Sequence, residues 1–103
     1  HTMIGPDAII KGPMELEQGL IVYGKIYGDI ATNGQVRVAK NGLVDGNIIG
    51  SSIHIGGTVS GNIKSRNQVI LKKSCILKGD ISYRKLHIED GAQFEGKCDL
   101  LSD

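Results

Sequence analysis

The sequence predicts an all-β protein, a parallel β-solenoid of about six coils with roughly 17 residues per coil and a triangular cross-section. An apolar-x-Gly-x-apolar unit recurs six times, and its successive glycines are 16, 18, 15, 18 and 17 residues apart. A triplet whose first and last residues are aliphatic, here called an apolar triplet, stands ahead of each of the last five glycines. The chain also has 15 glycines and 15 isoleucines, and glycine together with β-branched aliphatic residues favours strands and tight turns over packed helices.

The glycine-centred unit supplies one strand on either side of its glycine. The six copies are Ile10–Met14, Ile26–Ile30, Val44–Ile48, Val59–Ile63, Leu77–Ile81 and Phe94–Cys98. Alternation with a period of two predicts that the first and last residues of each unit point inward and stack from coil to coil. We expect the glycines at inward positions, where opposing walls of a narrow tube come close. Cys98 then takes an inward slot and is expected to be a buried thiol, whereas Cys75 lies in a loop and its exposure stays open.

The apolar triplets supply a further strand in each coil. They are Leu20–Val22, Val36–Val38, Ile53–Ile55, Val69–Leu71 and Leu86–Ile88. Either three or five residues connect a triplet to the next unit, so insertions are confined to one corner of the coil. A helix across 62–78 is rejected, because the apolar residues there form β-branched triplets at the repeat period.

Stacking places polar side chains in outward columns. Asp29, Asn47, Asn62 and Asp80 share one column, which we interpret as a polar ladder rather than a calcium or sugar site. Lys72-Lys73 and Glu89-Asp90 occupy matching places on adjacent coils, so opposite charges are expected side by side.

No catalytic, cofactor-binding or metal-binding site is predicted. His54 and His87 share an outward column with Ile70 between them, which puts them roughly 9.6 Å apart, too far for one metal ion. The basic stretch over 64–78 is interpreted as a solvated face, because no aromatic residues interleave with it. The net charge of +1 gives no electrostatic case for nucleic acid. Nucleophile, P-loop and dinucleotide motifs are absent, as are a membrane span and a signal-peptide core.

The two ends of the rod are expected to be adhesive. Neither end carries an amphipathic helix as a cap, so apolar side chains and unpaired strand edges invite end-to-end association. The predicted polymerisation interface comprises Ile4, Ile9, Ile10, Phe94, Leu100 and Leu101. We interpret residues 1–3 as a tag remnant, 4–101 as the solenoid and 102–103 as its C-terminal end.

The closing stretch Leu86–Cys98 resembles the end signature of bactofilins, bacterial polymer-forming cytoskeletal proteins, and the earlier Val-x-Gly-x-Ile units fit the same family. The resemblance implies a right-handed β-helix that forms filaments without nucleotide or polarity, by joining like ends. Phe94 matches the family's aromatic residue in the last coil. The resemblance further implies a cytoplasmic scaffold that recruits cell-wall or morphogenesis proteins at the inner face of the cell membrane. Family members typically add disordered tails, one of which can carry a membrane-binding segment; such tails are nearly missing from this sequence, so membrane binding is not carried over.

Two other classes of protein fit the sequence less well. A left-handed β-helix acyltransferase needs a strict six-residue period and a histidine base at a trimer cleft, whereas these units drift between 15 and 18 residues. A sugar-binding or ice-binding surface needs aromatic platforms or threonine ladders, and the chain has only Thr2, Thr32 and Thr58. The sequence therefore favours a structural protein over an enzyme.

Overall fold

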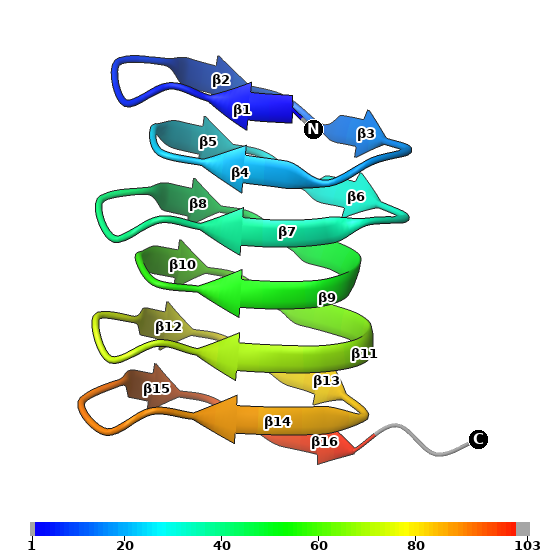
Figure 1. Ribbon diagram of the computed structural model, residues 1–103, viewed down its shortest axis with the longest axis vertical. Helices are drawn as coiled ribbons and strands as arrows, with labels where there is room; N and C mark the ends of the chain where they lie inside the picture. Colours follow the sequence, from blue (N-terminus) through cyan, green and yellow to red (C-terminus); the bar gives the residue numbers. More distant parts are fainter. Residues whose placement is uncertain (1, 101–103) are drawn as a thin grey trace.

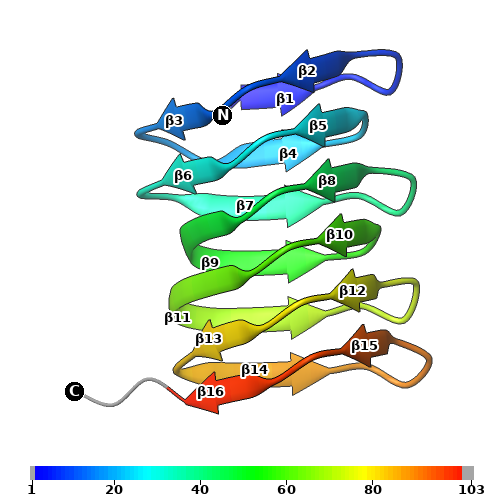
Figure 2. The ribbon, with the colours of Figure 1, turned by 180° about the vertical axis from the view of Figure 1, so that it is seen from behind.

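The computed structural model describes residues 2–100, which form sixteen short strands and no helix. Figure 1 shows six coils stacked along the long axis of a body with extents of 34 × 29 × 19 Å. As the chain descends, it runs right to left in front and left to right behind, so the coil is right-handed (Figure 1). The opposite view agrees (Figure 2).

Each coil contributes to three faces, and every strand pairing between coils is parallel. Face 1 contains β1 (Thr2–Ile4), β4 (Leu20–Val22), β7 (Gln35–Val38), the second half of β9 (Ile48–Ile55), the second half of β11 (Ile63–Leu71) and β14 (Lys85–Ile88). Face 2 contains β2 (Ile9–Lys11), β5 (Lys25–Tyr27), β8 (Leu43–Asp45), β10 (Thr58–Ser60), β12 (Ile76–Lys78) and β15 (Gln93–Glu95). Face 3 contains β3 (Met14–Leu16), β6 (Ile30–Thr32), the first halves of β9 and β11, β13 (Ile81–Tyr83) and β16 (Cys98–Leu100).

The predicted inward columns are confirmed by the strand register. On face 2, Ile10 pairs with Ile26, and the column continues through Val44 and Val59 to Leu77 and Phe94. The corresponding column on face 3 runs from Met14 to Cys98, and the triplet column on face 1 runs from Leu20 to Leu86. Branched aliphatic side chains suit these positions because they pack well between flat neighbouring strands. Those of the middle coils are fully buried and form one core.

The glycine column serves a different purpose from the one predicted. Gly28, Gly46, Gly61, Gly79 and Gly96 lie at the corner between faces 2 and 3, with φ between +137° and +155°. A Cβ on any of them would overlap the carbonyl oxygen of the glycine in the preceding coil. Glycine is therefore required by backbone conformation and by coil-to-coil stacking, not by the approach of opposing walls across the tube.

The polar ladder is confirmed and runs beside these glycines. The Asp29 carboxylate accepts a hydrogen bond from the Asn47 N–H at 3.0 Å, and the Asn47 side chain accepts one from the Asn62 N–H at 3.0 Å. Two further rungs lead through Asn62 and Asp80 to the Lys97 N–H, both at 3.1 Å. Each short side chain thus satisfies a corner N–H of the next coil, which holds the coils in register.

The N-terminal boundary of the solenoid is earlier than predicted. Thr2 and Met3 lie in β1, where they pair with Leu20 and Ile21 of β4. Excluding residues 1–3 from the fold was therefore wrong for these two, because their alternation continues that of face 1.

Candidate assembly interface

The last coil leaves the interior of the solenoid uncovered. Strands β14, β15 and β16 each pair with the coil above, and no strand within residues 2–100 pairs with their other edge (Figure 1). Their inward side chains are all apolar: Leu86, Ile88, Phe94 and Cys98 continue columns of the core, and Leu100 pairs with the half-buried Tyr83 of the coil above. Ile88 is 45% exposed and Leu100 is 67% exposed, although their counterparts in the middle coils are buried. An exposed apolar patch bounded by three unpaired strand edges is a typical association surface.

The first coil presents a smaller end surface. The inward side chains Ile10, Met14 and Leu16 are half-buried and pack against the core. Ile4 faces the same interior but is only 6% exposed. The N-terminal end therefore exposes less of its interior than the C-terminal end.

The predicted interface residues divide into three groups. Ile4, Ile10, Phe94 and Leu100 lie on the inward columns of the two terminal coils. Ile9 instead points outward from β2 and is 61% exposed on the lateral surface. Leu101 lies outside the residues that the structure describes.

Sequence reasoning missed Leu86, Ile88 and Cys98 as members of the C-terminal end surface. Their membership of the inward columns was the available signal, since any inward residue of an uncapped last coil is exposed at the end of the tube. The expectation that Cys98 is buried was wrong for the same reason: its slot faces inward, but no strand within residues 2–100 covers it.

The two thiols lie in opposite environments. Cys75 is buried in the core at the corner between faces 1 and 2, and this burial raises its pKa to about 11. Cys98 is exposed; slight burial, and then the nearby Asp99 carboxylate, raise its pKa. Cys75 is therefore a structural thiol, whereas Cys98 belongs to the end surface.

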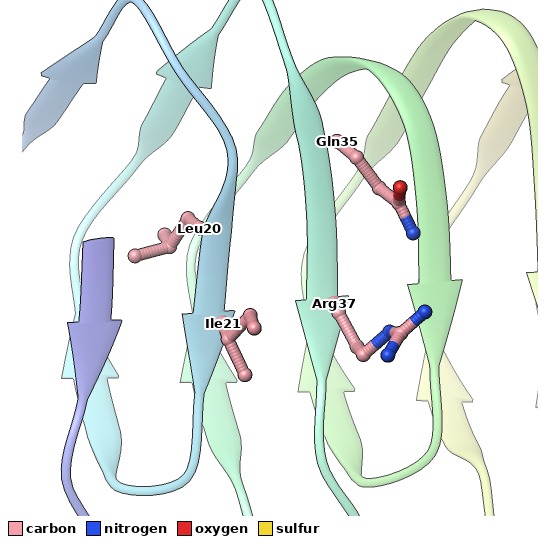
Figure 3. Close-up of a pocket in the computed structure, with 4 residues that line it drawn as sticks. All are labelled: Leu20, Ile21, Gln35 and Arg37. Atoms are coloured by element: carbon pink, nitrogen blue, oxygen red, sulfur yellow. The ribbon is translucent and has the colours of Figure 1, made fainter. Parts of the chain in front are cut away.

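Several open recesses lie on the lateral surface of the described residues. One of them has a volume of about 220 Å3 and lies on face 1. Figure 3 shows the residues that line it, Leu20 and Ile21 of β4 beside Gln35 and Arg37 of β7. These four side chains include no carboxylate, imidazole or thiol for acid–base or nucleophilic chemistry. Within residues 2–100, no cluster of three or more His, Cys, Asp or Glu side chains is arranged to hold a metal ion. No segment of that range forms a helix with the length and hydropathy to cross a membrane.

Comparison with known proteins shows a family with this architecture. Residues 2–99 match the family model described as bactofilin, polymer-forming cytoskeletal. Bactofilin BacO of Myxococcus xanthus (strain DK1622) is 33% identical over 100 residues, which are 97% of this chain and 79% of the relative. Among solved structures, the cryo-EM reconstruction of Thermus thermophilus bactofilin double helical filaments superposes with a TM-score of 0.93 at 26% identity, covering 98% of this chain and all of the other. The chain therefore belongs to the bactofilin family of polymer-forming cytoskeletal proteins.

Proposed function

We propose that this protein assembles end to end into filaments, without nucleotide, through the apolar surfaces of its terminal coils. The observation that carries the proposal is the uncovered interior of the last coil, where Ile88 and Phe94 continue the core columns to the end of the rod and Leu100 adds a further exposed apolar side chain. Stacking against another terminal coil would bury these side chains and pair the free edges of β14, β15 and β16. The likeness to a bactofilin solved as double helical filaments supports this reading.

Contact between like ends is part of the proposal. The C-terminal end is more open than the N-terminal end, so joining two C-terminal ends about a two-fold axis buries the most apolar surface at one contact. Alternating C-to-C and N-to-N contacts then produce a filament without polarity. The proposed role in the cell is a cytoplasmic scaffold that organises cell-shape or cell-wall machinery, and not an enzyme; the acyltransferase alternative is not favoured.

The test is electron microscopy and sedimentation of the purified protein with no nucleotide added. Phe94→Arg should abolish filaments and leave short soluble species, because end contact would bury an unpaired charge at a cost of several kcal/mol. Circular dichroism should show that the variant still folds, since the half-buried position lets the new side chain reach water in the free coil. Ser60→Arg adds the same charge on the outward surface of β10 and should assemble normally. Normal filaments from Phe94→Arg would refute this end contact.

A further inference from the structure

A recess lined by basic side chains interrupts the corner between faces 1 and 2. In coil 4 this corner is the two-residue turn Gly56–Gly57, whereas coils 3 and 5 have four-residue loops at 39–42 and 72–75. The longer loops project beyond the turn between them (Figure 1). The recess has a volume of about 370 Å3, and we call it the basic notch; its lining residues are Arg37, Val38, Ala39, Lys40, His54, Gly56, Lys72 and Ser74.

The positive charge of the basic notch is only partly balanced within the chain. None of its lining residues is acidic. Arg37 pairs in register with His54 on the adjacent strand, and Figure 3 shows its side chain extending from β7 toward β9. Within residues 2–100 the side chains of Arg37 and Lys40 have neither an ion pair nor a hydrogen bond, whereas Lys72 Nζ forms an ion pair with Glu89 Oε2 at 3.6 Å. Partial burial, followed by the charges of Arg37 and Lys72, lowers the pKa of His54, as expected in a region of positive potential.

The next long corner shows what such a recess can hold. There the carboxylate of Glu89 accepts a hydrogen bond from the Lys73 N–H at 3.1 Å and also forms the ion pair with Lys72. Lys40 is the counterpart of Lys73, because each is the second residue of a four-residue loop. Gly56 is the counterpart of Glu89, because each donates its N–H to the last residue of the strand in the coil above, Val38 and Leu71 respectively.

At the basic notch this internal carboxylate is missing. The Lys40 N–H has no hydrogen-bond partner within residues 2–100. A Cβ on Gly56 would lie 3.2 Å from the Val38 carbonyl oxygen, 3.7 Å from the Lys40 nitrogen and 3.8 Å from the Ser74 hydroxyl oxygen. A side chain at this position therefore needs a shift of a few tenths of an ångström and would lie next to the Lys40 N–H. An N–H group and several cations therefore surround a place that a carboxylate fills elsewhere in the same solenoid.

We propose that the basic notch binds a carboxylate side chain from an acidic segment of a partner protein, in the place that Glu89 takes at the later corner. The basic side chains of the notch do not follow from the repeat. Around the two-residue turn Tyr23–Gly24 of coil 2, the positions equivalent to Arg37, Lys40, His54 and Lys72 are Met3, Pro6, Ile21 and Ala39, none of which is charged. The notch lies on the side of the middle coils, so end-to-end assembly leaves it accessible.

The test measures fluorescence anisotropy of a labelled hexapeptide that alternates Glu and Ser, with a Gln–Ser peptide as its neutral counterpart. The full chain should bind the Glu peptide and not the Gln peptide, and binding should weaken as salt screens the charges. The double variant Arg37→Gln/Lys40→Gln should bind the Glu peptide roughly five- to tenfold more weakly. This fold-change corresponds to a loss of about 1 kcal/mol or slightly more in binding free energy. The double variant Lys11→Gln/Lys25→Gln removes the same charge from face 2 and should bind like the parent.

Gly56→Glu provides the missing carboxylate within the chain and should also abolish peptide binding. Equal binding by the two double variants, or equal binding of both peptides, would overturn the proposal. A competition experiment compares inorganic phosphate with acetate at equal concentration of negative charge. If phosphate displaces the labelled peptide more effectively than acetate, the notch is a phosphate site and the proposal is overturned. Phe94→Arg should bind the peptide like the parent, so a failure of the assembly proposal and a failure of this one are separate results.

Discussion

Replacing Gly61 by alanine tests why glycine occupies the corner between faces 2 and 3. Gly61 has a φ of +143°, which an L-residue rarely adopts, at a strain of about 1–3 kcal/mol. Its added Cβ would also overlap the Gly46 carbonyl, so coils 3 and 4 must separate, at a further cost of about 1–3 kcal/mol. The sum of about 2–6 kcal/mol corresponds to a melting temperature lower by at least about 8 °C for a domain of this size.

Gly12→Ala is the matched control, because Gly12 also has a positive φ, +105°, but a Cβ there would meet no atom within 4 Å. Its substitution therefore costs the backbone strain alone. Thermal and guanidinium unfolding of both variants, followed by circular dichroism, should show the larger loss for Gly61→Ala. Equal losses would refute the argument that coil-to-coil contact, beyond backbone conformation, excludes a side chain from this column.

Three further predictions concern particular side chains. A thiol reagent at pH 8 should modify Cys98 and spare Cys75 until the protein unfolds, and filaments should protect Cys98 if like ends meet. Folding lowers the pKa of His54, so the unfolded state binds the imidazole proton more tightly than the folded state does. The free energy of unfolding should therefore fall as the pH drops below about 6.5. Guanidinium titrations at several pH values should show a weaker pH dependence for His54→Gln. Asn62→Ala removes the acceptor for the Asp80 N–H and should cost about 0.5–1.5 kcal/mol in unfolding experiments without preventing assembly, whereas an unchanged midpoint would argue against the ladder.

The sequence predicted the parts of the structure that repeat. Val44 and Val59, for example, are equivalent in the repeat and pair in the register expected from it. The Lys72–Glu89 ion pair was also predicted, because equivalent positions on successive coils must be neighbours. Such inferences succeed because parallel stacking converts a separation in sequence into a fixed separation in space.

Departures from the repeat were harder to predict. Cys98 has the sequence pattern of a core residue, yet it is exposed, because no strand within residues 2–100 pairs with the free edge of β16. Cys75 lies in a loop, yet its side chain turns into the core. Ser65 had no sequence signal. Its buried hydroxyl lies 2.8 Å from the carbonyl oxygens of both Ser51 and Gln68, so its single proton is shared between these two acceptors at the bend within β11.

The amino-acid order alone determined a stack of about six coils, the residues that face its interior and the ladder of polar side chains along one corner. These follow from two periods, alternation along a strand and recurrence at about 17 residues, and both are local properties of the chain. Only the tertiary structure decided why the corner glycines are needed, which inward side chains remain uncovered at the ends, and that Arg37, Lys40, His54 and Lys72 surround one recess. Those features depend on what the neighbouring coil places against each residue, which no period in the sequence specifies.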